Sequence, residues 1–274
     1  MDYNKLADKL KTWAPYFKPW IESKDCDEVF RVLKDRSQSG GKNAPVAANL
    51  FKCFELTHIS DVRCIVVGLC PEHVFVREKG KEVPLADGLC LSTGDSWKTR
   101  PLTPAQEALY QSFEKDFGNG FMPDMIKTSD FSYLAQQGVL LYNIALTTQK
   151  DRPGSDIVLW RTFNEFFFKE VVDKQLQNVV ILFLGAEAKK SESLIDTTKN
   201  YCISIPHPAG VQYGQCYDND NCWQRINNIL VQNDTSYIKW FKEGKIEEIR
   251  RKMIFDQQKQ GVDIGDLPWE KTPF

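Results

Sequence analysis

Two short segments carry the residue types that could do chemistry in this chain. The first reads GLCPEH at residues 68–73, and the second reads HPAGV at residues 207–211. Each follows an apolar, β-branched run, at 64–67 and at 201–205, which predicts a buried strand ending in a loop. Because ligands of open α/β sheets bind beyond the carboxyl ends of the strands, we predict that the two loops form two walls of one active site.

The elements that must position these loops alternate along the chain. Apolar runs predict four strands at 64–67, 139–142, 179–184 and 201–205, and a further short strand at 89–92. Helical patterns lie at 106–117 (after Thr103 and Pro104), at 163–174 and at 188–193. The alternation predicts an α/β fold with three layers, α/β/α, around a central, mostly parallel four-stranded sheet.

The chain divides by pattern into three parts. Residues 1–60 have a helical pattern, and we expect them to pack on the core as an N-terminal region. Residues 61–232 hold the predicted α/β domain. Residues 233–274 form a C-terminal extension, predicted to be a charged helix at 237–253 followed by a tail that mixes acidic and aromatic residues.

Composition and spacing exclude several classes of function. The 274 residues carry a net charge of −2, so nothing in the average charge announces a nucleic-acid binder, although a neutral average can hide a basic patch. The eight cysteines form no CxxC pair and the three histidines do not join them at metal-ligand spacing, so we expect reduced thiols, no metal and no cofactor. The run GGK at 40–42 lacks phosphate-loop spacing, and no GxGxxG follows a strand, which excludes a nucleotide-binding Rossmann enzyme.

The N-terminus lacks the apolar stretch of a signal peptide, and no run approaches the ~18 apolar residues of a membrane span. We therefore expect an intracellular protein, in the cytoplasm and nucleoid or in the nucleus, with no membrane contact. We expect it to be a monomer.

Several segments resemble, in order along the chain, the uracil-DNA glycosylase superfamily and its family 1 enzymes in particular. LAQQGVLLYN at 134–143 is similar to the WAKQGVLLLN segment of that family, and its QGVLLxN part is highly specific. Each of the other matches is weaker alone: GLCPEH at 68–73, DGLCLS at 87–92, RPLTP at 100–104, LGAEAKK at 184–190, HP at 207–208 and the helix at 223–230. Together the matches cover roughly residues 60–232.

The resemblance implies a DNA glycosylase, which extrudes a nucleotide and hydrolyses the N-glycosidic bond of its base. Such a reaction needs a hydrogen-bond donor for the developing base oxyanion, a reader of the base edge and a group that places water. The resemblance implies that His207 is the donor, as a neutral imidazole, although a lone histidine is more often a structural loop residue. Asn143 could accept from N3–H and donate to O4, the pattern of uracil or thymine and not of cytosine, or it could simply cap the sheet.

The chain departs from the family where its chemistry is expected, and His207 and Cys70 are our candidate catalytic residues. Cys70 replaces the carboxylate that positions water, and a thiol is a poor base unless its pKa is lowered; a nucleophilic role is the alternative. Glu72 replaces the tyrosine that blocks a 5-methyl group, so we hypothesise that it admits or hydrogen-bonds a polar 5-substituent. Leu91 replaces the phenylalanine that stacks on the base, unless Phe75 supplies a ring instead.

Neighbouring residues complete the candidate sites. The substrate-binding set is Asn143, Glu72, Leu91, His73 and Leu69. The DNA-binding set comes from the matching loops and contains Pro101, Thr103, Gly185, Ala186, Lys189, Val211 and Tyr213. Val211 stands near the place of the family's intercalating leucine, and Tyr213 is close enough to substitute for it.

Two functions are consistent with these residues. The first is a DNA glycosylase that acts on a uracil- or thymine-like base, including a 5-modified one. The alternative is a catalytically weakened or inactive module of the same fold that binds DNA or protein. The tail ends in Thr272, Pro273 and Phe274 and resembles tails that dock on replication or repair proteins. It predicts such a protein as a partner beside DNA, unless the tail is simply a disordered or self-packed terminus.

Overall fold

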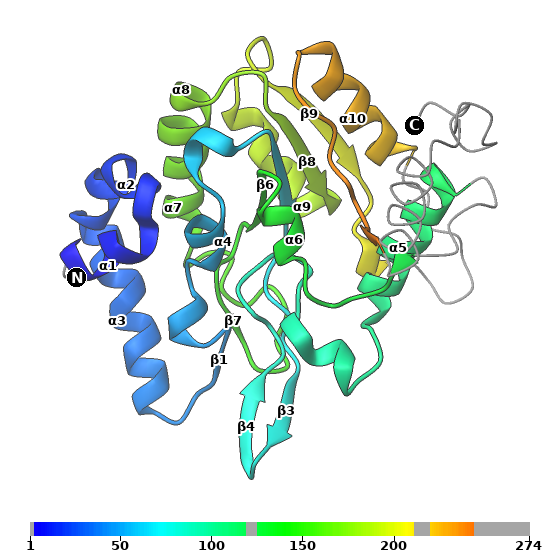
Figure 1. Cartoon of the computed structure of the whole chain (residues 1–274). Coiled ribbons are helices and arrows are strands. Elements are labelled where there is room, and N and C mark those ends of the chain that lie inside the picture. The colour runs from blue at the N-terminus through cyan, green and yellow to red at the C-terminus, as the bar shows by residue number, and fades with distance from the viewer. Residues whose placement is uncertain (1–2, 119–124, 211–219, 244–274) are drawn as a thin grey trace, which may run out of the picture.

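A four-stranded parallel sheet forms the centre of the molecule (Figure 1). The computed structural model describes residues 3–118, 125–210 and 220–243. The strands lie in the order β6, β2, β8, β9, and their bounds in that order are Val139–Asn143, Cys64–Gly68, Val180–Leu184 and Tyr201–Ile205. All neighbouring strands in this sheet are parallel. The predicted α/β fold with a parallel four-stranded sheet is confirmed, and each strand begins and ends within one residue of its predicted bounds.

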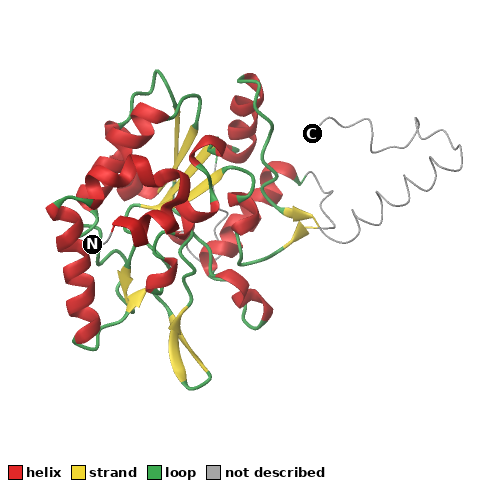
Figure 2. Ribbon diagram, turned by 60° about the vertical axis from the view of Figure 1, so that its left-hand side comes forward, coloured by secondary structure: helices red, strands yellow, loops and turns green. Residues whose placement is uncertain are grey.

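One face of the sheet is covered by two helices, α5 (Pro104–Phe117) and α10 (Cys222–Gln232) (Figures 1 and 2). Pro104 stands at the first helical position of α5, as predicted, and Thr103 caps it. The Thr103 hydroxyl accepts from the Gln106 N–H, while the Gln106 side chain accepts from the Thr103 N–H. This capping box satisfies two backbone donors and fixes where the helix starts.

The opposite face is covered by α4, Lys52–Leu56, and by one long helix between β6 and β8. That helix comprises α7, Arg161–Phe166, a π-helical turn at Phe167–Val172 and α8, Asp173–Gln175. Tyr142 of β6 packs against Phe167 with ring centroids 4.6 Å apart. The predicted helix at 163–174 is therefore present, with a π turn that periodicity alone does not reveal.

The N-terminal helices pack onto this same layer (Figure 1). They are α1 Tyr3–Leu10, α2 Ala14–Ile21 and α3 Lys24–Gln38. Phe17 meets Phe54 and Phe163 edge to face, with ring centroids 4.9 and 5.5 Å apart. Edge-to-face pairs of this kind contribute about 0.5–1.5 kcal/mol each beyond the area they bury.

Short elements connect the layers. They are the antiparallel pairs β1–β7 (Asn43–Ala44 with Thr148–Gln149), β3–β4 (Phe75–Glu78 with Lys81–Pro84) and β5–β10 (Met125–Ile126 with Lys242–Glu243), and the helices α6 (Ser132–Ala135) and α9 (Gly185–Lys189). Helix α9 begins three residues before the predicted start at 188. A 3₁₀ turn, Lys190–Leu194, continues it.

Two local predictions are wrong. Residues 89–92 form a turn instead of a strand, because Leu91 adopts a positive φ of 61° that no strand allows. Residues 237–243, the start of the predicted C-terminal helix, are extended, and the rest of that helix lies outside the described residues. The extended backbone is held by side chains of the core: Gln137 exchanges two hydrogen bonds with Lys239, and Asn227 exchanges two with Ile238.

Within the described ranges, no helix is long and apolar enough to cross a membrane.

Candidate active site

The carboxyl ends of the parallel strands bring the candidate residues to one edge of the sheet. Gly68 and Asn143 end adjacent strands, β2 and β6, and lie opposite each other in the register. Gly185 directly follows β8, and His207 lies two residues after β9. This edge is where ligands bind in open α/β sheets.

Asn143 is buried at the end of β6, with 4% of its surface exposed. Gly68 lets it sit there, because a Cβ on Gly68 would lie 2.6 Å from Asn143 Oδ1 and 2.4 Å from Cys90 Sγ. Among the described residues we find no hydrogen bond to the Asn143 carboxamide. Neither polar atom of this carboxamide is among the fully buried unpaired atoms, so the amide reaches the surface at the sheet edge, where a polar ligand can pair with it.

His207 is half-buried, and its hydrogen bonding defines its tautomer. The Ala209 N–H donates to Nδ1 across 3.1 Å, so Nδ1 carries no proton and the neutral ring carries its proton on Nε2. Burial lowers the pKa of His207 below its usual value, which keeps the ring neutral at pH 7. Gly185, at φ +85°, allows the close approach, since a Cβ there would lie 3.0 Å from the His207 Cβ.

The loop after β2, residues 68–74, is held by its neighbours and is called the Cys70 loop below. Its Leu69 carbonyl accepts from the Ala145 N–H across 3.0 Å, and its His73 carbonyl accepts from the Asp151 N–H across 3.1 Å. The Cys70 thiol accepts from the Gly154 N–H across 3.3 Å. The segment after β6 thus fixes the conformation of the Cys70 loop.

The Cys70 thiol is not activated. Burial raises its pKa above the ordinary value, and the hydrogen bonds from Gly154 and Thr148 oppose this only partly. The thiolate is the reactive form of cysteine, so a protonated Cys70 is unsuited both as a nucleophile and as a base at neutral pH.

Glu72 is engaged within its own loop. Its Oε1 accepts from the backbone N–H groups of His73 and Val74, at 3.0 and 3.3 Å, and lies 3.3 Å from His73 Nδ1. The carboxylate therefore caps the turn that leads into β3. Phe75, the alternative source of a ring, is half-buried as the first residue of β3 and pairs with Pro84.

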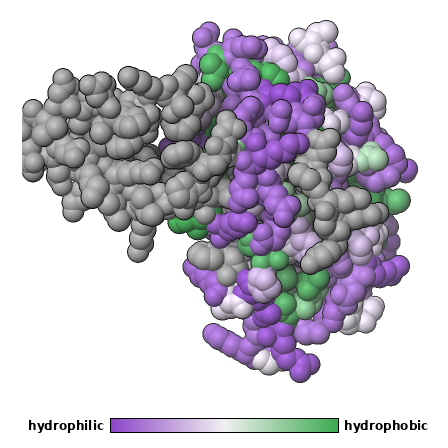
Figure 3. Space-filling view, turned by 90° about the vertical axis from the view of Figure 1, so that its right-hand side faces the viewer, coloured by the Kyte–Doolittle hydropathy of each residue, from purple (hydrophilic) through white to green (hydrophobic). Residues whose placement is uncertain are grey.

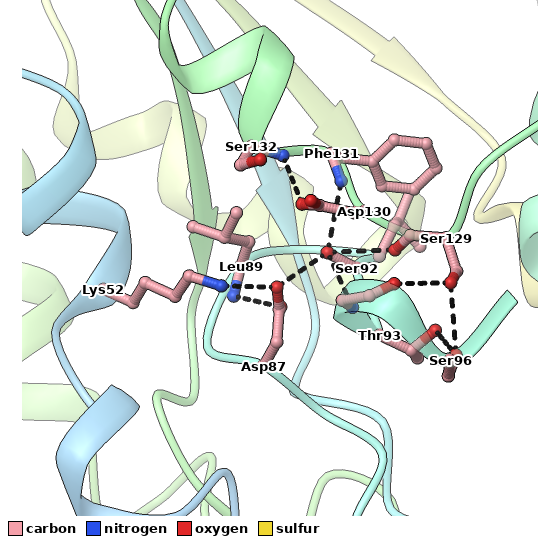
Figure 4. Close-up of polar contacts among 12 residues, drawn as sticks. Lys52, Asp87, Leu89, Ser92, Thr93, Ser96, Ser129, Asp130, Phe131 and Ser132 are labelled. Carbon is pink, nitrogen blue, oxygen red and sulfur yellow. Dashed lines mark hydrogen bonds and ion pairs between the residues drawn. The ribbon is translucent and has the colours of Figure 1, made fainter. Parts of the chain in front are cut away.

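Leu91 lies in a turn that is built by a buried polar network, shown in Figure 4. Asp87 accepts from the Leu89 N–H and the Ser92 hydroxyl and forms an ion pair with Lys52, with Nζ and Oδ2 2.6 Å apart. The Ser129 carbonyl lies 3.1 Å from the Ser92 hydroxyl and shares its one proton with Asp87. The Leu91 carbonyl accepts from the Gln106 side chain. These bonds hold Leu91 at its positive φ, half-buried against the core.

Sequence reasoning missed a second buried network, behind the Cys70 loop. Asp156 is 1% exposed and forms a bidentate ion pair with Arg36, whose two terminal nitrogens lie 2.8 and 2.9 Å from the two carboxylate oxygens. The Thr147 hydroxyl donates to Asp156, and the Trp160 indole N–H donates to Thr147. The network anchors residues 147–160, the segment that supplies the Gly154 N–H to Cys70. Arg36 and Asp156 are far apart in sequence, so no local pattern signals their contact.

The candidate DNA-binding residues lie in several places. Gly185, Ala186 and Lys189 line a hollow of about 250 Å³ at the ends of β8 and β9, together with Ser204, Ile205 and Pro206. Pro101 is exposed, whereas Thr103 is occupied as the cap of α5. Val211 and Tyr213 lie outside the described residues. In the part of the chain that the structure describes, no group of three or more His, Cys, Asp or Glu residues could hold a metal ion.

Two of three comparisons with known proteins find similar proteins that are named uracil-DNA glycosylase. No family model matches the chain. It is 27% identical over 231 residues to the uracil-DNA glycosylase of Amoebophilus asiaticus, covering 83% of this chain and 98% of the relative. It is 27% identical over 235 residues to the uracil-DNA glycosylase of Aeromonas salmonicida, covering 84% and 98%. The crystal structure of mimivirus uracil-DNA glycosylase superposes with a TM-score of 0.75 at 19% identity, covering 88% of this chain and 89% of that one.

Proposed function

We propose that this chain, which belongs to the uracil-DNA glycosylase superfamily, is a DNA glycosylase that releases uracil from DNA. The observation that carries the proposal is the pair of polar groups at the sheet edge. Asn143 offers a buried carboxamide for which we find no partner in the described residues, and His207 is a neutral ring whose proton lies on Nε2. A pyrimidine-2,4-dione edge offers N3–H, O4 and O2 to such groups.

The proposed reaction begins when the uracil nucleotide is turned out of the DNA stack. Asn143 Oδ1 accepts from N3–H and Nδ2 donates to O4, which selects uracil over cytosine because cytosine would leave both groups unpaired. The C1′–N1 bond breaks with its electron pair moving onto the base, and His207 Nε2–H donates to the negative charge that develops on O2. Water then adds to the sugar cation at C1′ and loses a proton to solvent.

A neutral His207 suits this role better than a charged one. A neutral imidazole can donate a hydrogen bond without the cost of placing a charged ring in a partly buried site. The lowered pKa of His207 keeps the ring neutral. Its Nδ1 is already occupied by the Ala209 N–H, so the ring orientation is set before a base arrives.

The experiment that tests this function is an abasic-site assay on single- and double-stranded oligonucleotides containing one uracil. We expect base release by the purified protein and its loss in His207→Ala. Release from no uracil substrate, by a protein that unfolds cooperatively, would reject the proposal.

A finer proposal concerns the substituent that the site accepts at the 5-position of the base. No ring of the kind expected to exclude a 5-methyl group stands at Glu72, whose Oε1 is occupied by backbone N–H groups while the carboxylate stays half-buried beside His73. We propose that the site accepts 5-substituted uracils, polar ones in particular. Release from 5-hydroxymethyluracil DNA that is no faster than from uracil or thymine DNA would reject it.

One observation favours a second function, a binding module with weak or no catalysis. Cys70, a protonated thiol, stands where the family has the carboxylate that positions water, so this loop offers no base at that position. Such a module would bind DNA, and a replication or repair protein through its acidic, aromatic tail. Tight binding to uracil-containing DNA without release of any base would favour this alternative.

A further inference from the structure

A hairpin extends the Cys70 loop outward from the sheet edge. Strands β3 and β4 pair from Phe75 with Pro84 to Glu78 with Lys81, and a two-residue turn closes them. Both turn residues have positive φ, 47° at Lys79 and 79° at Gly80, as the tight turns that match strand twist require. The hairpin projects beyond the helical layers (Figures 1 and 2), and its tip forms the hydrophilic lower end of the face in Figure 3.

Ion pairs connect the hairpin to the rest of the protein, and a backbone hydrogen bond closes its base. Glu82 forms ion pairs with Lys42, next to β1, and with Lys150, next to β7, the latter with Nζ and Oε1 2.8 Å apart. Hydrogen bonds from Lys150 and Lys42 lower the pKa of Glu82 to about 2, so the carboxylate stays charged over the working pH range. At the base of the hairpin, the Leu85 N–H donates to the Val74 carbonyl across 2.9 Å.

Three exposed cations stand on the hairpin. The register places Glu82 opposite Arg77 and Glu78 opposite Lys81, but the Glu82 carboxylate is already paired with Lys42 and Lys150. Arg77, Lys79 and Lys81 are exposed and form no ion pair with any described residue. Cations that are not neutralised within the protein are available to neutralise the charge of a ligand.

The position of these cations identifies the ligand. The hairpin begins two residues after His73, so a DNA strand that delivers its base to the sheet edge passes along it. Arg77 and Lys79 are two residues apart, about 7 Å along an extended chain, which corresponds to about two nucleotides at about 3.4 Å of rise each, and Lys81 lies beside them on the return strand. The spacing therefore suits consecutive phosphates of one strand.

We propose that the β3–β4 hairpin is a DNA-binding arm, whose residues Arg77, Lys79 and Lys81 bind phosphates of the strand next to the extruded nucleotide. This inference rests on the proposed function for its choice of nucleic acid. It assigns affinity for DNA to the arm and leaves base recognition to Asn143 and His207.

The test is equilibrium binding of a duplex made only of G·C pairs, which contains no uracil or thymine and so reports backbone binding alone. The variant is Arg77→Gln/Lys79→Asn/Lys81→Gln. Asparagine suits a positive φ better than lysine does, so the turn is preserved. The matched control, Lys169→Gln/Lys174→Gln/Lys199→Gln, removes the same charge from exposed lysines on the long helix and just before β9.

We expect the arm variant to bind about tenfold more weakly near 0.1 M salt. The slope of log K against log salt should become shallower by about 2 to 3, since each lost phosphate contact contributes about 0.9. The control should bind like the wild type. Unchanged binding of the G·C duplex by the arm variant, or an equal loss of binding in the control, would overturn the proposal.

A parallel base-release assay separates this inference from the proposed function. If no substrate is cleaved but the arm variant alone loses G·C-duplex affinity, the glycosylase proposal fails and the arm stands. If uracil is released normally and the arm variant binds like the wild type, the arm fails and the glycosylase proposal stands.

Discussion

The loop after β9 and the loop after β2 lie at the same sheet edge but offer a base very different groups. After β9, the Nδ1 of His207 accepts a hydrogen bond from the Ala209 N–H, which sets the orientation of the ring and leaves its proton on Nε2. Burial lowers the pKa of this ring and keeps it neutral. After β2, the Cys70 thiol accepts from the Gly154 N–H, and one carboxylate oxygen of Glu72, Oε1, accepts from the backbone of the Cys70 loop. Under the proposed function, these groups would stabilise a departing base, and none of them would activate water.

This difference predicts how the reaction is limited. Stabilising a leaving group and activating a nucleophile are separate contributions to the barrier, and each can be worth several kcal/mol. A chain that keeps only the first breaks the glycosidic bond through a more fully developed sugar cation, which solvent water then captures. Substitutions on the two loops should therefore have unequal effects.

The largest effect is expected for His207→Ala. It removes the donor to O2 and should slow single-turnover uracil release by about 10²–10³-fold, the usual cost of losing one oxyanion donor. The same assay on Cys70→Ala should stay within about threefold of the wild type. Equal losses in both variants would show that the two loops share the chemistry.

Asn143→Ala should follow, with release slowed by about 10²-fold. It removes two hydrogen bonds to the base, each worth about 0.5–1.5 kcal/mol net. Since the carboxamide makes no hydrogen bond within the described residues, thermal unfolding should show a stability close to that of the wild type. A marked loss of stability would indicate that Asn143 caps the sheet instead of reading a base.

Cys70→Asp should increase the rate, by about tenfold or more. A carboxylate at this position accepts from the Gly154 N–H as the thiol does and adds the base that the loop lacks. Cys70→Asn is the matched control, because it has nearly the same shape without the charge. A rate that is unchanged or lower in the aspartate variant would mean that water activation does not limit base release.

The smallest effect is expected for Gly185→Ala. The added Cβ would lie 3.0 Å from the His207 Cβ, at a backbone φ of +85° that costs other residues about 1–2 kcal/mol. We expect a few-fold slower release with a modest loss of stability in urea unfolding. Full activity would show that the placement of His207 tolerates such a shift.

Local pattern accounts for what could be predicted from the sequence. Short apolar runs located the four strands. Asn143 directly follows one predicted run and His207 comes two residues after another, so their place at the sheet edge was predictable. The turn at Leu91 was missed because Lys52, Ser129 and Gln106, which are distant in sequence, hold it. The extended backbone at 237–243 was missed for a similar reason, since Gln137 and Asn227 take the hydrogen bonds that a helix would have satisfied internally.

The protonation state of His207 tests the central claim most directly. Nitrogen NMR of the imidazole ring, recorded from pH 8 to pH 5, reports the tautomer and the pKa together. We expect a neutral ring protonated on Nε2 at pH 7, with a pKa below the usual value near 6.5, and uracil release that falls only as the ring becomes charged below that pKa. An imidazolium at pH 7, or a neutral ring protonated on Nδ1, would contradict this expectation.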